Sequence, residues 1–373
     1  IFSVINYSKQ NINQDDIDAV IEVLNSDFLT QGPKVPEFEN ALRDYCSVDY
    51  VKVVSNATAA LHLAYLAIGI KKGDVVWTSP NTYVATANAA LYCGAEVDFV
   101  DIDARTYNMS VSSLEAKLQQ AKKDKKLPKL IVPVHFSGQS CEMKDIWKLS
   151  QEYGFKIIED ASHALGAEYL GKKVGCCEYS HMALFSFHPV KMITTGEGGA
   201  IVTNDKELDE QVSLLRSHGI TKDENRFLNE SHGNWYYEQH FLGYNYRLTE
   251  MQAALGISQL KRLDSFVEKR REIARFYLNN LKELVLPFQH PDTHSSWHLF
   301  VIQTENRKKV FQKLIEAGIQ TQVHYIPVNS QPFYDRERLN NSESLYKNCL
   351  SLPIYFDLTK DELEKVVKNL RHD

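Results

Sequence analysis

Residues 50–100 read YVKVVSNATAALHLAYLAIGIKKGDVVWTSPNTYVATANAALYCGAEVDFV, and this stretch decides the fold class. Three short apolar runs, at 50–54, 74–78 and 96–102, predict β-strands, because β-branched and aromatic residues favour extended structure. The alanine-rich stretches between these runs predict two helices. Strands and helices that alternate at this spacing are typical of a mostly parallel sheet covered by helices, so we expect an α/β fold.

The same alternation continues toward the middle of the chain. We expect strands at LIVPVHF (from 130), FKIIED (155–160), ALFSF (from 183) and GAIVT (from 199), and helices near 112–121, 143–153 and 205–216. An irregular polar and aromatic stretch follows, up to about residue 246. Together these elements predict a large domain over residues 1–248, which includes an N-terminal helical arm over about 1–30.

The pattern changes after residue 248. Apolar residues recur every three to four positions over 248–284, which predicts one long helix of roughly 50 Å. The remainder predicts strands at WHLFVIQ and TQVHY, a helix over about 307–317 and a terminal helix after Thr359. We therefore expect a smaller C-terminal α/β domain over residues 249–373, entered by the long helix.

The composition is that of a folded globular protein and limits its partners. The chain has 373 residues, 43% of them hydrophobic, and a net charge of −6 without a dense Lys/Arg tract, so neither nucleic acid nor a membrane surface is the expected partner. Six cysteines without C-x-x-C pairs indicate reduced thiols and no metal site. No long apolar run or secretory signal is apparent, so we expect a cytoplasmic protein.

Polar residues that directly follow predicted strands are the first candidates for chemistry, because open α/β sheets bind ligands at the carboxyl ends of their strands. Ser55-Asn56-Ala57-Thr58 opens a helix, where backbone N–H groups can hold a phosphate; an ordinary helix cap is the alternative. Asp160 ends one strand, and Lys191 follows another. Taken singly, the acid is equally explained as a cap, and the lysine as a solvated surface residue.

The combination is more informative than its parts. A phosphate-binding helix start, an acid that ends a central strand and a lysine 31 positions after that acid are what pyridoxal phosphate requires. A buried lysine loses its proton more easily and becomes a nucleophile, while the acid pairs with the pyridine nitrogen. Tyr83 is a candidate to stack on the ring, although an aromatic residue at a helix start is often part of the core.

The motifs resemble those of the DegT/StrS-type nucleotide-sugar aminotransferases, which are fold-type I pyridoxal-phosphate enzymes, over nearly the whole chain. The resemblance depends on eight segments. They are LTQGP (29–33), SNATAALHLA (55–64), SPNTYVATANAAL (79–91), EDASHALGA (159–167), FSFHPVKMITTGEGGAIVTND (185–205), RSHGI (216–220), GYNYRLTEMQAALG (243–256) and QVHYIPV (322–328).

This resemblance implies roles for individual positions. Lys191 is expected to hold pyridoxal phosphate through a Schiff base, and Asp160 to pair with the pyridine nitrogen. The remaining implied cofactor contacts are Ala57, Thr58 and Ser186 at the phosphate, Tyr83 and His163 at the ring, and Asn245 from the neighbouring subunit of a homodimer with shared active sites. The implied substrate contacts are Thr30, Arg247, His324 and Tyr325, of which Arg247 and His324 are equally explained by structural roles.

The resemblance also implies a reaction. The motifs are most similar to those of the pseudaminic acid branch of the family, which implies amino transfer from L-glutamate to C-4 of a UDP-linked 4-keto-6-deoxy-N-acetylhexosamine. Perosamine-type and bacillosamine-type 4-keto-sugar aminotransferases share most of the motifs and are the alternative. A sugar dehydratase with a histidine at the lysine position, a non-catalytic regulator and a plain nucleotide-binding module are weaker alternatives. The role of the aromatic segment 227–240 is left open.

Overall fold

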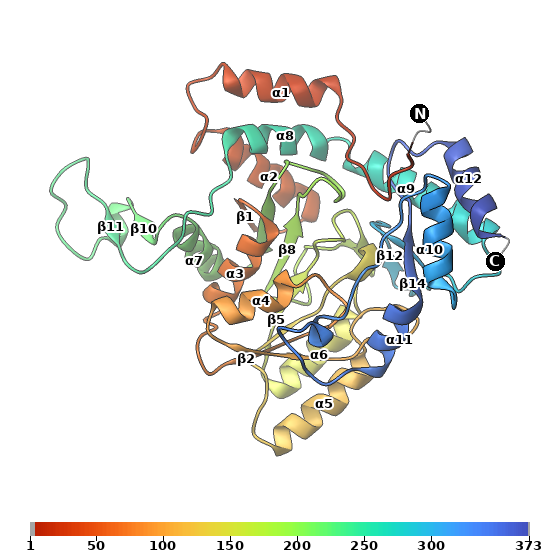
Figure 1. Ribbon diagram of the computed structural model, residues 1–373. Coiled ribbons are helices and arrows are strands. Elements are labelled where there is room, and N and C mark those ends of the chain that lie inside the picture. The colour runs from red at the N-terminus through yellow and green to blue at the C-terminus, as the bar shows by residue number, and fades with distance from the viewer. Residues whose placement is uncertain (1–3, 372–373) are drawn as a thin grey trace.

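The computed structural model describes residues 4–371 and has a central seven-stranded sheet with helices on both faces (Figure 1). In pairing order its strands are β1 (Tyr50–Val54), β9 (Gly199–Thr203), β8 (Met182–Ser186), β5 (Lys156–Asp160), β4 (Leu130–Val132), β2 (Val75–Thr78) and β3 (Glu96–Phe99). β9 is antiparallel to both its neighbours, and the other neighbouring pairs are parallel. The predicted fold class, a mostly parallel sheet between helices, is confirmed.

The direction of the strands gathers three candidate segments at one edge of the sheet. β1 and β8 both pair antiparallel with β9 and therefore run in the same direction, as does β5, which is parallel to β8. The carboxyl ends of these three strands consequently lie side by side. Asp160 and Ser186 are the last residues of β5 and β8, and Asn56 follows β1 and caps the next helix.

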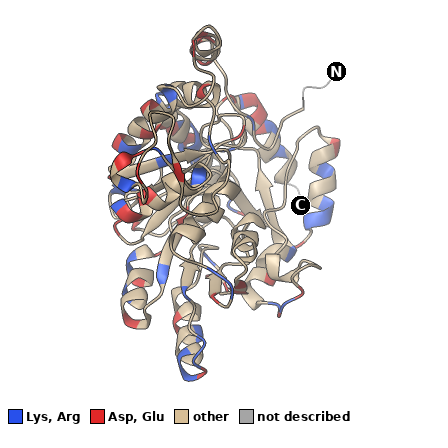
Figure 2. Cartoon of the chain, turned by 90° about the vertical axis from the view of Figure 1, so that its left-hand side faces the viewer, with Lys and Arg blue, Asp and Glu red and all other residues tan. Residues whose placement is uncertain are grey.

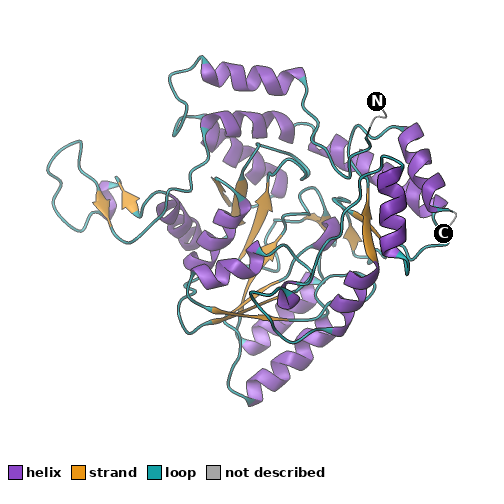
Figure 3. Cartoon of the chain, viewed as in Figure 1, coloured by secondary structure: helices purple, strands orange, loops and turns teal. Residues whose placement is uncertain are grey.

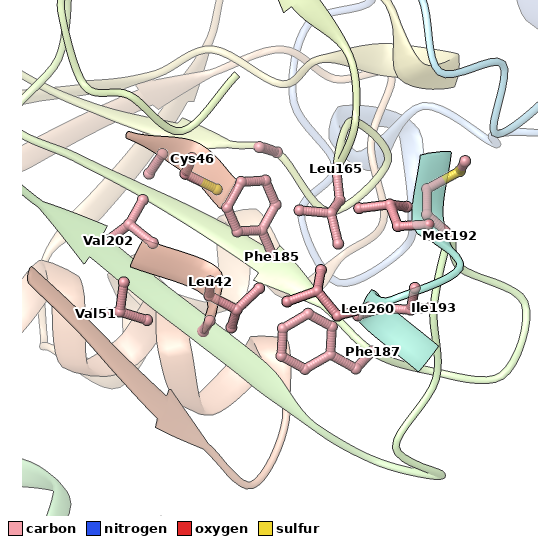
Figure 4. Packing of buried hydrophobic residues seen from close by; sticks show 14 of the residues in the cluster. Leu42, Cys46, Val51, Leu165, Phe185, Phe187, Met192, Ile193, Val202 and Leu260 are labelled. Atoms are coloured by element: carbon pink, nitrogen blue, oxygen red, sulfur yellow. The ribbon is translucent and has the colours of Figure 1, made fainter. Parts of the chain in front are cut away.

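Helices cover both faces of the sheet (Figure 3). One face carries α3 (Ala57–Ala67), α4 (Ala85–Tyr92) and α7 (Lys206–Arg216). The other carries α2 (Lys34–Cys46) and α8 (Glu250–Leu260) beside β1, β9 and β8, and α5 (Val111–Lys123) and α6 (Met143–Tyr153) beside β4 and β5. In the layer formed by α2 and α8, Phe185 and Phe187 pack against Leu42 and Leu260 (Figure 4). This packing fixes β8, the strand that precedes Lys191.

The C-terminal part of the chain has its own buried cluster around the antiparallel pair β13 (Phe300–Gln303) and β14 (Cys349–Leu352). Its helices are the second half of α9 (Leu263–Asn280), α10 (Arg307–Glu316) and α12 (Lys360–Leu370). α11 (Asn340–Asn348) packs against the same strands through Leu345, in a separate cluster with Val301 and Cys349. A small sheet of β12 (Thr293–His294), β6 (Glu168–Tyr169) and β7 (Lys172–Lys173) joins this part to the loop after β5. The exact division into two domains stays a prediction.

The prediction of one long helix over 248–284 is wrong. The segment forms α8 and α9, and the helix is interrupted at Lys261 and Arg262. The guanidinium of Arg262 binds the side chains of Asn11 and Asp16, next to and within α1 (Gln14–Leu24). α8 packs against α1 and α2, whereas α9 continues into the C-terminal cluster, so the break lets the two helices serve different cores.

The strand predicted at TQVHY is also absent. Within residues 321–325, only Gln322 forms a bridge, to Ser351 of β14. The chain then leaves the sheet, and His324 and Tyr325 line a cavity instead of continuing a strand. Alternation of polar and apolar residues predicted extended structure here but did not distinguish a strand from an extended loop.

Residues 222–237, predicted as irregular, form an arm that projects from the body beyond the pair β10 (Ile220–Thr221) and β11 (Glu238–Gln239) (Figure 1). The buried carboxylate of Glu238 accepts hydrogen bonds from the N–H groups of Leu228 and Asn229 and from the Tyr236 hydroxyl, at 2.6–2.9 Å. The arm is therefore internally ordered. Its tip still exposes apolar side chains, with Leu228 79% and Trp235 77% exposed.

Charges of both signs are interspersed over the outer helices, without a basic face on the side shown in Figure 2. Among the helices of residues 4–371, none combines the length and the apolar character needed to cross a bilayer.

Arg270 of α9 offers a test of how the C-terminal part is held together. Its buried guanidinium donates to the carbonyl oxygens of Trp297, His298 and Ile354, at 3.4, 3.1 and 2.8 Å. Arg270→Met should lower the free energy of unfolding by about 3 kcal/mol or more, because the buried carbonyls lose their donor. Urea denaturation measures the change.

Arg275→Met on the same helix is the matched control. Arg275 is 59% exposed and pairs with Glu268 at the surface, so its replacement should change stability by about 1 kcal/mol or less. Equal effects of the two substitutions would contradict the role given to Arg270.

Candidate active site

A cavity of about 760 Å³ opens at the carboxyl edge of the sheet, between the large sheet and the C-terminal elements. It brings together most of the residues expected to form a site. The predicted residues that line it are Ala57, Thr58, Tyr83, Asp160, His163, Ser186, Lys191, His324 and Tyr325. These residues come from segments spread over more than two thirds of the sequence, so only the tertiary fold assembles them.

Asp160 lies buried at the end of β5 and is held by hydrogen-bond donors. The Thr86 hydroxyl donates to one carboxylate oxygen at 2.8 Å, and the backbone N–H and hydroxyl of Ser162 donate to the other at 3.1 and 2.6 Å. These donors fix the orientation of the carboxylate group. Sequence reasoning missed both partners, although Ser162, two positions after an aspartate, fits a common local turn.

Lys191 lies in the turn after β8, where its backbone N–H donates to the His188 carbonyl at 2.9 Å. Burial lowers the pKa of its ammonium to about 8, and the nearby negative charge of Asp160 opposes this shift. Within residues 4–371 the ammonium forms no hydrogen bond or ion pair. The lysine is therefore available as a free amine at mildly alkaline pH.

The start of α3 has the properties of an anion site. The Asn56 side chain caps the Ala59 N–H at 2.8 Å, which leaves the N–H groups of Ala57 and Thr58 without a partner among the described residues. A Cβ at Gly199 would lie 2.8 Å from the Ala57 nitrogen, so only glycine lets β9 approach this turn. Cap and anion site thus coexist: Asn56 caps the helix, and the two free N–H groups border the cavity.

His163 and Tyr325 lie next to each other in the lining of the same cavity. The Ser137 N–H donates to His163 Nδ1 at 3.2 Å, and Nε2 lies 3.1 Å from the Tyr325 hydroxyl. Because Nδ1 accepts, a neutral ring carries its proton on Nε2 and donates it to Tyr325. Burial, reinforced by the charge of Lys191, holds the pKa of His163 well below its usual value.

His324 and His298 are two further buried imidazoles at the cavity. His324 Nδ1 lies 2.8 Å from the Ser351 hydroxyl, and burial together with Lys191 lowers its pKa to about 3. The His298 ring packs 4.4 Å from that of His163, and His298 Nδ1 is buried without a hydrogen-bond partner in the described chain. His298 was not foreseen, because a single histidine in a strand-like segment carries no distinguishing signal.

Three predicted residues lie outside this cavity. Thr30 and Asn245 are exposed, and Arg247 is half-buried. Each forms an isolated β-bridge: Thr30 with Thr249, Asn245 with Ser217, and Arg247 with Val54. The single chain therefore does not bring Thr30, Asn245 or Arg247 to the predicted cofactor and substrate contacts.

Comparison with known proteins fits this geometry. The profile of the DegT/DnrJ/EryC1/StrS aminotransferase family matches residues 10–371. The chain belongs to this family. It is a pyridoxal-phosphate-dependent nucleotide-sugar aminotransferase, which takes a nucleotide sugar and an amino donor as substrates.

Three relatives illustrate the similarity. The UDP-4-amino-4,6-dideoxy-N-acetyl-beta-L-altrosamine transaminase of Campylobacter jejuni serotype O:23/36 is 43% identical, over 98% of this chain and 96% of the relative. The Helicobacter pylori aminotransferase PseC, described as involved in pseudaminic acid biosynthesis, superposes with a TM-score of 0.89 at 34% identity, covering 99% and 98% of the two chains. Spr1654 of Streptococcus pneumoniae, solved in a PMP (pyridoxamine phosphate) form, has a TM-score of 0.89 at 28% identity and 98% coverage of both chains.

The residues present fit pyridoxal phosphate. The cavity supplies two free N–H groups and the Ser186 hydroxyl for a phosphate, a buried carboxylate for a ring nitrogen and a half-buried lysine without an ion-pair partner among residues 4–371 for an aldehyde. Nδ1 of His298, which has no hydrogen-bond partner among the described residues, is a further polar atom of a residue that lines the cavity.

The His163 geometry leads to a prediction for the ligand-free protein. Its ring should stay neutral, with the proton on Nε2, at pH values where an ordinary histidine is already protonated, because burial and Lys191 both lower the pKa of the imidazole. Nitrogen-15 NMR of histidine-labelled protein reports the tautomer, and His163→Gln assigns the signal. A ring that titrates near the usual histidine value would contradict the hydrogen bond from Ser137.

Proposed function

We propose that this enzyme transfers an amino group from L-glutamate to C-4 of a UDP-linked 4-keto-6-deoxy-N-acetylhexosamine of the pseudaminic acid type. The observation that carries the amino-transfer chemistry is that the half-buried Lys191 and the buried Asp160 line one large cavity. The choice of sugar is supported by the 43% identity to a transaminase named for UDP-4-amino-4,6-dideoxy-N-acetyl-beta-L-altrosamine.

In this proposal the cavity residues hold the cofactor in a fixed orientation. Ala57, Thr58 and Ser186 bind the phosphate, and Asp160 pairs with the pyridine nitrogen. Tyr83 and His163 contact the ring. Lys191 binds the aldehyde carbon covalently until an amino donor displaces it.

Pyridoxal phosphate, when bound, takes up the electron pair that is released when a substrate C–H bond breaks. Lys191 then acts as the base that removes the proton from the donor α-carbon, and its low pKa allows this near neutral pH. Asp160 keeps the pyridine nitrogen protonated through its charge. With the keto sugar, Lys191 acts in the opposite direction and delivers a proton to the sugar C-4, while the glutamate carbon skeleton has already left as 2-oxoglutarate.

The three residues outside the cavity are assigned to a homodimer. We propose that Asn245 of the partner subunit reaches the cofactor phosphate, and that Thr30 and Arg247 contact the nucleotide sugar across the same interface. Support comes from Asn245 itself, which is exposed and forms an isolated β-bridge with Ser217, three residues before β10 of the projecting arm. A monomer would then be inactive.

Other 4-keto-sugar aminotransferases, of the perosamine or bacillosamine type, are the second candidate, because the cavity residues named above are compatible with either sugar. A dehydratase is disfavoured, since position 191 is a lysine and not a histidine. A non-catalytic regulator is disfavoured because the chain keeps both the lysine and the acid in one cavity.

The substrate is tested by a panel of nucleotide sugars. Purified enzyme with L-glutamate should aminate a UDP-4-keto-6-deoxy-N-acetylhexosamine of altro configuration faster than UDP-linked bacillosamine-type and GDP-linked perosamine-type ketones, as measured by mass spectrometry of the amino sugar. Preference for either of the other ketones would contradict the pseudaminic assignment while leaving the amino-transfer chemistry intact.

The pKa of Lys191 gives a pH prediction. Only the free amine attacks an aldehyde, so covalent uptake of pyridoxal phosphate by the apoprotein should accelerate with pH and level off above a midpoint near pH 8. Asp160→Asn should move this midpoint to lower pH, because the charge of Asp160 stabilises the ammonium. Absorbance spectra follow the uptake, and borohydride traps the product.

Lys191→Ala is the control and should retain no cofactor after borohydride treatment. Trapping on another lysine, or a midpoint near the ordinary lysine value of about 10.4, would contradict the assignment.

A further inference from the structure

His62 of α3 lines the cavity and contacts two tyrosines of the segment 244–246. Its Nδ1 lies 3.3 Å from the Tyr246 hydroxyl, and its ring centre lies 4.7 Å from that of Tyr244. The two tyrosine rings stack on each other at 5.1 Å. The three rings therefore form one packed unit, the His62 cluster.

Asn245 lies between the two tyrosines. The backbone here is held along one edge, because the Tyr244 N–H donates to the Leu215 carbonyl at 2.7 Å and the Tyr246 N–H donates to the Arg216 carbonyl at 3.1 Å. Successive side chains of an extended segment point to opposite sides. Since both tyrosines face His62, the side chain of Asn245 is directed away from α3, and it is exposed. The His62 cluster thus sets the direction in which Asn245 points.

The histidine leaves one polar atom unpaired in order to make this contact. His62 is 5% exposed, and its Nε2 is buried without a hydrogen-bond partner among residues 4–371. Burial also lowers its pKa, so the ring is neutral. An apolar ring would fill the same space without an unpaired atom. The contact between Nδ1 and Tyr246 is therefore what distinguishes histidine from phenylalanine at this position.

The phosphate-binding start of α3 does not depend on this contact. Its N–H groups at Ala57 and Thr58 are positioned by the Asn56 cap and by the close approach of Gly199. His62 lies more than one helical turn further along α3. Loss of the contact with Tyr246 should accordingly leave these N–H groups in place and affect mainly the segment that carries Asn245.

We propose that His62 is a positioning residue that holds Asn245 in place for the cofactor phosphate of the neighbouring subunit, and that it acts on that site and not on its own. This inference rests on the proposed function, in which Asn245 crosses the dimer interface. His62 itself touches no reacting atom in this proposal. Its loss should therefore be detected at the phosphate and not at the aldehyde.

Absorbance titrations of the apoprotein test the proposal by comparing pyridoxal phosphate with pyridoxal, which has the same aldehyde but no phosphate. His62→Phe keeps an aromatic ring and removes the contact with Tyr246. It should weaken the binding of pyridoxal phosphate by roughly five- to tenfold, the effect of about one hydrogen bond, and leave that of pyridoxal unchanged. Borohydride trapping on Lys191 confirms that both ligands occupy the same site.

Tyr246→Phe is the second variant and removes the same contact from the other side, with a single oxygen deleted. It should narrow the difference between the two ligands as His62→Phe does. Combining either variant with Asn245→Ala should add little to the effect of Asn245→Ala alone, because residues that act through one another are not additive.

His181→Phe is the matched control. The His181 ring also packs against an aromatic side chain, 5.5 Å from that of Trp147, and its Nδ1 also takes part in one hydrogen bond, from the Ile157 N–H at 3.1 Å. It lies outside the cavity. Its substitution should leave the ratio of the two affinities unchanged.

Mixed dimers of differently tagged chains determine which subunit is affected. Each dimer contains one Lys191→Ala chain, so only one site can bind the aldehyde covalently. His62→Phe placed in the Lys191→Ala chain should weaken pyridoxal phosphate binding at the intact lysine of the other chain. His62→Phe placed in the chain that keeps the lysine should leave this binding at the wild-type level.

The outcomes separate this inference from the proposed function. An unchanged affinity ratio in His62→Phe and Tyr246→Phe, or equal losses for both ligands, would overturn only the role of His62. So would a loss confined to the subunit that carries the substitution. A wild type that is monomeric, or that binds no pyridoxal phosphate, would overturn the proposed function and this inference with it.

Discussion

The structure depends on placing the amine of the half-buried Lys191 and the carboxylate of the buried Asp160 in one cavity. Taking an ammonium out of water is unfavourable, and the chain does not surround Lys191 with acids to offset the cost; it leaves Asp160 as the nearby opposite charge. The result is a lysine with a lowered pKa and an acid whose own oxygens are already occupied by Thr86 and Ser162. Both groups are thus prepared for a ligand that supplies an aldehyde and a basic ring nitrogen.

The sheet provides this arrangement at little additional cost. Parallel strands end at one edge, and polar residues that follow different strands therefore meet there whatever their separation in sequence. β9 is the exception in direction, and its first residue, Gly199, lies against the start of α3. That contact holds two backbone N–H groups at the cavity. The antiparallel strand β9 thus supports the backbone N–H groups of the site, whereas the residues at the ends of the other strands provide its side chains.

Most strands and helices of the central sheet, and Lys191 and Asp160 as candidate residues, could be predicted from sequence, because each rests on a local pattern in or next to a strand. The partners of Asp160 could be predicted less well: Thr86 is far away in sequence and becomes a neighbour only through the fold. The break at Arg262 was missed because α8 and α9 continue one helical periodicity, and only the tertiary bonds to Asn11 and Asp16 reveal the interruption. Extended loops such as 321–325 share the alternation of strands and differ from them only in whether a neighbouring strand pairs with them.

The N-terminal segment has a consequence for biosynthesis of the enzyme. Its residues 5–8 are synthesised more than 300 positions before their hydrogen-bond partners Gly318, Gln320 and Ile354. Such non-local pairing is slow to form and leaves the segment unsatisfied during translation. The sheet can fold early, whereas residues 5–8 can take their place beside the pocket only after residue 354 has left the ribosome, so a nascent chain that ends before residue 318 cannot carry a finished site.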